Sequence, residues 1–94
     1  MALAFDWDAQ KAADNLRKHS ISFNEVASIF GDPLSTTFYD PDHSFGEHRF
    51  ITIGLSNRAK LLVVTHTDRE QAIRIISARK ATRAERNYYE ENQD

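Results

Sequence analysis

The chain has 94 residues, of which 40% are hydrophobic and 28% charged, and it contains no cysteine. This length suits one small domain, and the composition is typical of a folded globular protein rather than a disordered one. The lack of cysteine excludes disulfides and thiolate metal sites. No apolar run approaches the length of a membrane span. We therefore expect a single cytoplasmic domain over residues 1–94.

Positive charge is concentrated toward the C-terminal end of a chain that is acidic overall. The formal net charge is −2, yet residues 69–86 hold six Lys or Arg and only two Glu. The segments before and after this stretch are each net acidic. A local cationic surface attracts polyanions whatever the average charge of the chain. Residues 69–86 therefore predict contact with a nucleic acid or an acidic partner.

The first third of the chain predicts two helices. Leu3–Trp7 is either a short edge strand or an apolar anchor. Asp8 is a good N-cap for a helix over Ala9–His19. Ser22 and Glu25 have the spacing of a capping box, which starts a second helix.

The rest of the chain predicts a sheet followed by a helix. Successive β-rich segments with short connections indicate an antiparallel meander. The expected strands are Leu34–Asp40, Arg49–Leu55, Leu61–Thr67 and Ala72–Ser77. A last helix is expected to begin near Ala78 or at Thr82. The predicted fold class is thus α+β, with two N-terminal helices, a roughly four-stranded antiparallel sheet and a C-terminal helix.

The basic residues of the last segment follow a helical period. Arg79, Arg83 and Arg86 stand at i, i+4 and i+7, which places them on one side of a helix. Like charges on one helical face repel one another. A nearby anion would offset this repulsion.

Several short segments match those of a known family. They are Phe5–Asp8, Lys11, Asn15–Leu16, Lys18–His19, Phe23, Val64–Thr67 and Arg74–Arg79. On these residues the chain resembles the BrnT toxins, over nearly its whole length from about Phe5 to Tyr89. One departure is Ser20, a position that is usually glycine in that family.

The resemblance implies a RelE-like fold and a ribonuclease toxin of a type II toxin–antitoxin system, which cleaves RNA and so inhibits translation and growth. It also implies a protein partner, a BrnA-like antitoxin with a ribbon-helix-helix domain, and a toxin dimer within a toxin–antitoxin heterotetramer. Because the chain has no obvious DNA-reading element, we expect operator DNA to be bound only through the antitoxin. No cofactor and no membrane contact are expected.

Metal-independent RNA cleavage makes the ribose 2′-hydroxyl the nucleophile. It needs a proton acceptor there, a cation at the phosphate and an acid at the departing 5′-oxygen. Arginine suits the phosphate because its fork grips two oxygens and stays charged. The candidates for this role are Arg74, Arg79 and Arg83, and His66 is the acid–base candidate.

The relation between His66 and Arg74 depends on the turn that joins their strands. If Ala72 belongs to the turn, the two residues lie directly opposite each other and share a face. If the turn is limited to residues 68–71, they point to opposite faces. The sequence leaves both registers open. It also allows His66 to be a strand-end histidine that bonds a backbone carbonyl.

Further residues could hold RNA around the cleavage site. Arg49, Lys80 and Arg86 add positive charge, and Tyr88 could stack on a base. The arginine face could instead be a docking surface for an acidic antitoxin segment. The alternative function is accordingly a non-catalytic module whose arginine-rich patch docks a partner protein or RNA.

A metal site has little support in the sequence. The acidic loop over residues 40–48 holds carboxylates and imidazoles, which can bind zinc or manganese. Their spacing matches no ligand pattern, and Asp-Pro-Asp is ordinary turn chemistry. We therefore predict no metal ligand.

Overall fold

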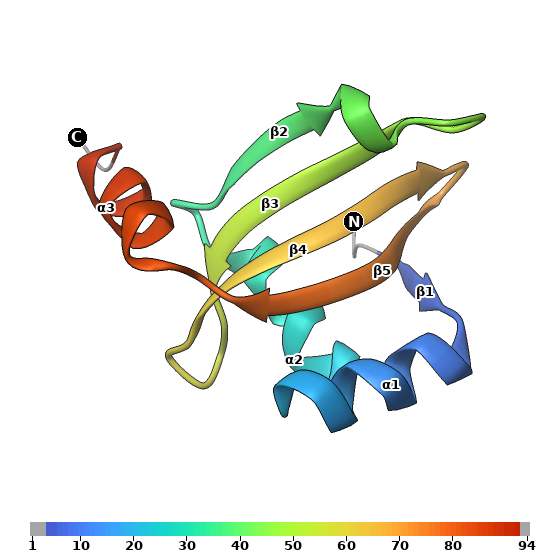
Figure 1. The fold of residues 1–94 in the computed structure, drawn as a ribbon, viewed down its shortest axis with the longest axis horizontal. Coiled ribbons are helices and arrows are strands. Elements are labelled where there is room, and N and C mark those ends of the chain that lie inside the picture. Colours follow the sequence, from blue (N-terminus) through green and yellow to red (C-terminus); the bar gives the residue numbers. More distant parts are fainter. Residues whose placement is uncertain (1–3, 93–94) are drawn as a thin grey trace.

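The computed structural model describes residues 4–92 and contains a five-stranded sheet in the order β1-β5-β4-β3-β2 (Figure 1). The strands are β1 (Phe5–Trp7), β2 (Thr36–Asp40), β3 (Arg49–Leu55), β4 (Leu61–Arg69) and β5 (Ala72–Lys80). The α-helices are α1 (Ala9–His19), α2 (Phe23–Ala27) and α3 (Arg83–Glu91). Short 3-10 turns, η1 and η2, lie at Ser28–Gly31 and Pro41–His43.

The predicted α+β class is confirmed, but the sheet is mixed rather than purely antiparallel. β1 pairs in parallel with β5, so the sheet has a fifth strand at its edge. Phe5 and Trp7 pack against the main core, and the amide of Ile73 donates to the carbonyl of Ala4 at 2.9 Å. Leu3, the first residue of the expected segment, lies outside the described residues.

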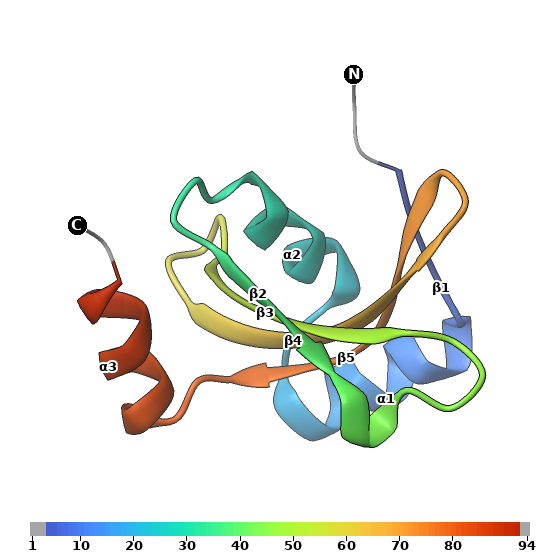
Figure 2. The ribbon, with the colours of Figure 1, turned by 90° about the horizontal axis from the view of Figure 1, so that it is seen from above.

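The two faces of the sheet are covered differently. The main core lies between the sheet and the first two helices, with α2 against one side of the sheet (Figure 2). Its buried members are Ile21, Phe23, Val26, Ile29, Leu62, Val64, Ile75 and Ala78. On the opposite face, which we call the open face, α3 covers one end only. There Tyr89 packs with Ile53, Leu61 and Val63, and its hydroxyl donates to Asp32 Oδ2 at 2.6 Å.

The helix starts follow the predicted caps, with one exception. Asp8 accepts from the amides of Gln10 and Lys11 at 2.7 and 3.2 Å. Ser22 accepts from the Glu25 amide at 3.1 Å. The carboxylate of Glu25 does not close the box, because it is buried and accepts from Ser56 Oγ at 2.7 Å. The predicted capping box at α2 is therefore half formed.

The C-terminal helix starts later than the earlier of the two predicted positions. β5 continues to Lys80, and α3 begins at Arg83 after a complete Thr82–Glu85 capping box. Arg79 is therefore a strand residue. The prediction that it shares a helical face with Arg83 and Arg86 was wrong, because pairing with β4 holds this part of the chain extended.

The end of α1 gives a first test of the fold. Ser20 caps the helix in the left-handed region, with φ 59° and ψ 32°, where glycine avoids the steric cost of a Cβ. We expect Ser20→Gly to raise the free energy of unfolding by about 0.5–1 kcal/mol. Urea unfolding measures this change. Ala13→Gly, an exposed change inside the same helix, should instead lower it by about 1 kcal/mol, and equal shifts in both variants would contradict the argument.

Candidate functional site on the open sheet face

One residue from every strand lines up across the open face, at the end of the sheet that α3 leaves free. We call this set the strand row. Directly paired residues on neighbouring strands share a face, and the pairing runs without a break across all five strands. In sheet order from β2 to β1, the strand row is Asp40, Arg49, Thr67, Arg74 and Asp6.

The strand row combines one paired guanidinium, one unpaired guanidinium and a hydroxyl without a partner. Arg74 Nη1 donates to Asp6 Oδ1 at 3.1 Å. The carboxylate of Asp40 is bonded to His43 at 2.8 Å, and Arg49 forms no ion pair within residues 4–92. Thr67 is fully buried, and its Oγ1 has no hydrogen-bond partner among the described residues. An anion between the two arginines would complete these interactions.

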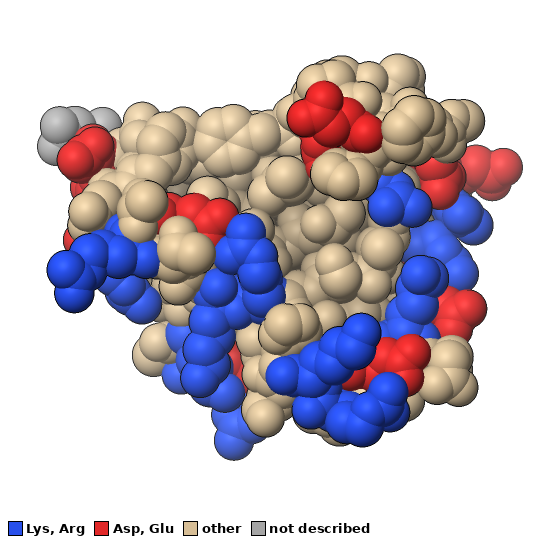
Figure 3. All heavy atoms as spheres, viewed as in Figure 1, with Lys and Arg blue, Asp and Glu red and all other residues tan. Residues whose placement is uncertain are grey.

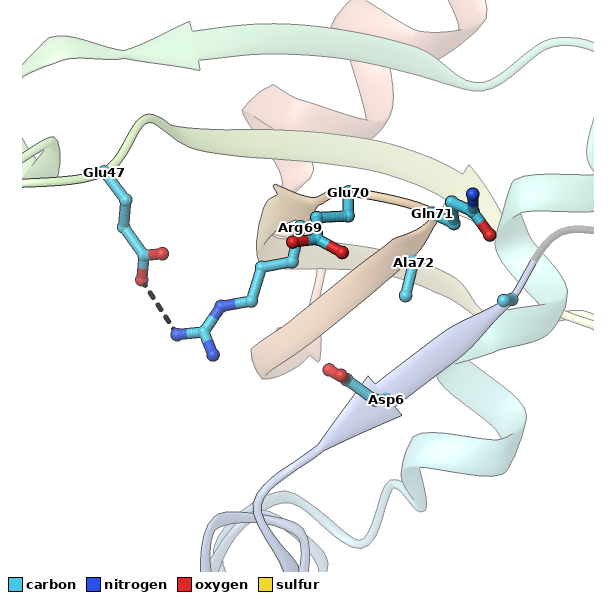
Figure 4. A pocket seen from close by; sticks show the side chains of 7 residues that line it. Asp6, Glu47, Arg69, Glu70, Gln71 and Ala72 are labelled. Atoms are coloured by element: carbon cyan, nitrogen blue, oxygen red, sulfur yellow. Dashed lines mark hydrogen bonds and ion pairs between the residues drawn. The ribbon is translucent and has the colours of Figure 1, made fainter.

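An open cavity of about 660 Å³ adjoins the strand row (Figure 4). Arg69 and Ala72 form the next pair on the same face of the sheet, and Figure 4 shows the carboxylate of Asp6 directed into the same space. Asp6 thus belongs to both the strand row and the cavity. The cavity is lined by Ala4, Asp6, Glu47, Arg69, Glu70, Gln71 and Ala72. Its carboxylates outnumber its single arginine, so it suits a base or a ribose better than a phosphate.

A second basic group lies at the other end of β5. Arg79 donates to both carboxylate oxygens of Glu85, at 2.7 and 2.8 Å. This pairing lowers the pKa of Glu85 to about 2 and raises the pKa of Arg79. Arg83 and Arg86 form no ion pair within residues 4–92. We call Arg83 and Arg86 of α3, together with Arg79 near the end of β5, the helix cluster.

The two basic groups are too far apart to hold the same phosphate. Arg74 and Arg79 lie on one strand with four residues between them, a separation of roughly 15 Å at the usual rise of a strand. Figure 3 accordingly shows Lys and Arg side chains in separate groups around an uncharged area. The predicted convergence of Arg74, Arg79 and Arg83 on one phosphate is therefore not what the structure contains.

His66 lies on the helix-covered face, away from Arg74. The two-residue turn at 70–71 places His66 opposite Ile75 and Thr67 opposite Arg74, and a bulge that leaves Ile76 unpaired follows farther along β5. The structure has neither of the two predicted registers, because the turn is limited to residues 70–71. His66 and Arg74 nevertheless point to opposite faces, as the shorter of the two predicted turns implied.

The surroundings of His66 are closed and largely apolar, with one carboxylate nearby, Asp68, whose Oδ1 lies 3.9 Å from Nδ1. The His66 side chain is 4% exposed and stacks on Phe50, with the edge of the ring toward Phe30. Its Nε2 is 2.8 Å from Thr52 Oγ1, and burial lowers its pKa. His66 therefore cannot reach RNA on the open face.

The remaining predicted RNA-binding residues lie apart from one another. Lys80 is paired with Leu62, a residue of the covered core, so it does not project from the open face. Tyr88 packs on Phe38 with ring centroids 5.3 Å apart. Arg86 stands two residues earlier, about 200° around the helix axis. Tyr88 and Arg86 therefore point to different sides of α3.

Asp6 and Thr67 are the site residues that sequence reasoning missed. The apolar–polar–apolar order of Phe5–Trp7 was a usable signal for Asp6, because it predicts two inward side chains and one outward. Thr67 lies in the Val64–Thr67 segment that resembles the family, but its role depends on the arginines on both neighbouring strands, which the sequence does not place beside it.

The Arg79–Glu85 pair predicts a pH dependence of stability. The folded-state pKa of Glu85 is about 2, below its ordinary value of 4.5, so its contribution is present above pH 4.5 and is lost as pH falls toward 2. Because both side chains are partly exposed, we expect a loss of only about 1 kcal/mol. Urea unfolding at pH 5 and pH 2.5 measures it. Glu85→Gln should lack this part of the acid destabilisation, and identical losses in both proteins would contradict the prediction.

A sheet with α1 and α2 packed on one face, and with α3 and a row of polar and charged side chains on the other, defines a small α+β protein. Comparison with known proteins identifies the family. A family model described as "Ribonuclease toxin, BrnT, of type II toxin-antitoxin system" matches residues 7–85. The chain belongs to the BrnT family.

A solved structure supports the fold. The crystal structure of the Brucella abortus ribonuclease toxin BrnT is similar to this chain with a TM-score of 0.63 and 21% sequence identity. The alignment covers 87% of this chain and all of that one. A search among curated proteins finds no significant match. No helix within residues 4–92 is long and apolar enough to cross a membrane.

Proposed function

We propose that this chain is a cytoplasmic endoribonuclease toxin that cleaves RNA without a metal and so inhibits translation and growth. Membership of the BrnT family supports the reaction class. The single observation that carries the proposal is the strand row, in which Arg49 and Arg74 flank a buried hydroxyl on an open face. No group of three or more potential metal ligands occurs within residues 4–92.

The strand row is proposed to hold the phosphate that is cleaved. Arg49 offers an unpaired guanidinium and Arg74 one that a carboxylate already orients. Donors fixed around a phosphate stabilise the charge that develops in the transition state. Arg79, Arg83 and Arg86 are proposed to bind other phosphates of the same RNA, because Arg79 lies roughly 15 Å from Arg74 along β5. His66 is not part of this proposal.

The partner is proposed to be a BrnA-like ribbon-helix-helix antitoxin, in a heterotetramer that contains a toxin dimer. Arg83 and Arg86 are exposed and lack ion pairs within residues 4–92, so an acidic antitoxin segment would find complementary charge there. Operator DNA is proposed to be bound through the antitoxin. Binding of operator DNA by the isolated chain at physiological salt would contradict this part.

The deciding experiment is incubation of the purified protein with RNA in EDTA. The expected result is cleavage that survives chelation and is abolished in Arg74→Ala with its fold intact. Intact RNA together with tight, salt-sensitive binding would instead support a non-catalytic RNA-binding module. Cleavage that appears only when a divalent metal is restored would support a metal-dependent nuclease. Either result would overturn the proposal.

A further inference from the structure

The carboxylate of Asp6 stands where a proton acceptor for RNA cleavage is needed. The strand row has two carboxylates, and that of Asp40 is bonded to His43. Asp6 borders the open cavity and touches the guanidinium of Arg74. We infer that Asp6 accepts the proton of the attacking ribose 2′-hydroxyl. This inference rests on the proposed ribonuclease function.

The two carboxylate oxygens of Asp6 have different surroundings. Oδ1 accepts from Arg74 Nη1 at 3.1 Å, whereas Oδ2 accepts no hydrogen bond from any residue in the described range 4–92. The side chain is 49% exposed, so this second oxygen is open to a substrate. A general base must lie within hydrogen-bond reach of the proton that it takes. A nucleotide in the cavity, with its phosphate at Arg74, brings its ribose to Asp6.

The other acid–base groups near the open face are less suited to this role. Glu70 also lines the cavity, but it lies in the turn between β4 and β5 and is not paired with a guanidinium among residues 4–92. Both oxygens of Glu85 are held by Arg79, and its low pKa makes it a weak base. Glu47 also has one oxygen without a partner, but the guanidinium that it pairs with at 3.3 Å is that of Arg69, which lies outside the strand row. His66 is buried under the helices on the other face. Asp6 is the carboxylate that combines an open oxygen with a neighbouring phosphate-binding guanidinium.

The reaction balances without a further reactant. The 2′-oxygen forms a bond to phosphorus as its proton passes to Asp6 Oδ2, and the bond from phosphorus to the 5′-oxygen breaks. The 5′-oxygen takes a proton from water, and Asp6 returns its proton to the solvent. The products are a 2′,3′-cyclic phosphate and a 5′-hydroxyl. Arg74 stays charged throughout and offsets the negative charge that builds on the phosphate.

The buried hydroxyl of Thr67 provides independent support for a phosphate at this place. It is paired with Arg49 on one side and Arg74 on the other. A buried donor without a partner is uncommon in a folded protein and marks a place where a bound group completes the hydrogen bonding. Because its Oγ1 is fully buried in this structure, a phosphate oxygen between the two arginines would accept from it only after the covering side chains move aside.

The test compares Asp6→Asn, Asp6→Glu and the wild type in RNA cleavage over a range of pH. We expect Asp6→Asn to lower kcat/KM by about 100-fold, to keep RNA affinity, and to lose the rise of kcat/KM with pH on the acid side. Asp6→Glu should recover part of the rate and restore that rise. Asp68→Asn, an exposed change outside the site, should match the wild type.

Each contrary result has a distinct meaning. If Asp6→Asn cleaves within threefold of the wild type, Asp6 is not the proton acceptor, although the ribonuclease function stands. If it loses activity but keeps the acid-side rise, Asp6 only positions Arg74, and the inference is again overturned. A wild type that leaves RNA intact overturns both the inference and the proposed function.

Thr67→Val separates a functional hydroxyl from a structural one. Valine keeps the shape and removes only an unpartnered group, so the midpoint of urea unfolding should stay the same or rise. RNA cleavage should nevertheless fall about tenfold. Unchanged cleavage would show that Thr67 does not bind the phosphate. Thr65→Val, two residues earlier on β4, is the matched control and should leave cleavage unchanged.

Discussion

Arg74→Ala is expected to lower kcat/KM for RNA cleavage by 100- to 1,000-fold, or about 3–4 kcal/mol of transition-state stabilisation. Within the strand row, the guanidinium of Arg74 is held in place by its hydrogen bond to Asp6 at 3.1 Å. Removing it takes away the donors closest to the proposed phosphate position. Steady-state cleavage of a fluorescent RNA in EDTA measures the change.

The effect of Arg74→Ala on stability should be small. The Arg74 side chain is 27% exposed and its partner Asp6 is 49% exposed, and such pairs contribute about 0–1 kcal/mol. A loss of activity through unfolding is therefore not expected, and circular dichroism checks this directly. Arg74→Lys should not restore the rate fully, because an ammonium cannot reproduce the two-pronged grip of arginine on phosphate.

A comparison with two other arginines localises the effect. Arg83→Ala should weaken RNA binding by about 3- to 10-fold with little change in kcat, because this side chain belongs to the helix cluster. Arg58→Ala, in the turn between β3 and β4, should change neither quantity. If Arg83→Ala lowered kcat as strongly as Arg74→Ala did, the reaction centre would have to be moved to the helix cluster.

Local signals in the sequence were sufficient for the helices. Asp8 and Thr82 both accept hydrogen bonds from the first turns that they were predicted to cap. These signals depend on residues three or four apart, so they survive without tertiary information. Glu25 is the instructive exception, because its carboxylate found a partner 31 residues away in Ser56. A buried tertiary hydrogen bond outcompeted the local one.

The candidate site was harder to predict because it is made by pairing between distant segments. Asp6 and Arg74 are 68 residues apart in the chain, and only the parallel pairing of β1 with β5 brings them together. The register between β4 and β5 adds to the difficulty, because the turn is limited to residues 70–71 and this places Thr67 opposite Arg74. A shift of one residue reverses the face of every following side chain. The sequence identified Arg49 and Arg74 but not their common row.

The length of β5 explains the misplacement of Arg79. A run of residues 78–86 is compatible with a helix, and the arginine spacing favours one. Lys80 nevertheless pairs with Leu62, so β4 extends the strand to that point. The helix then starts at the first position where a cap is available and pairing has ended. Tertiary context overrides a helical period when a neighbouring strand is long enough.

His66 is expected to contribute to stability and not to catalysis. It is 4% exposed, packed against Phe50 and bonded to Thr52. His66→Ala should lower the free energy of unfolding by about 2–4 kcal/mol, because it leaves a cavity and removes a buried hydrogen bond. Cleavage per folded molecule should stay within threefold of the wild type. A 100-fold loss in the folded fraction would place the imidazole in the reaction after all.

The pH dependence of stability gives the same residue a second and independent test. Burial lowers the folded-state pKa of His66 below its ordinary value of 6.5, so protonation favours the unfolded chain. The stability that neutral His66 provides is complete above pH 6.5 and is lost as pH falls through the folded-state pKa.

Wild-type stability should therefore decline between pH 7.5 and pH 5 in urea unfolding, and His66→Ala should show a flatter profile. His48→Ala, which removes an exposed imidazole bonded to Tyr39, controls for the loss of a histidine side chain as such. Equal slopes in the wild type and His66→Ala would mean that His66 reaches solvent, and an imidazole that reaches solvent could again take part in proton transfer.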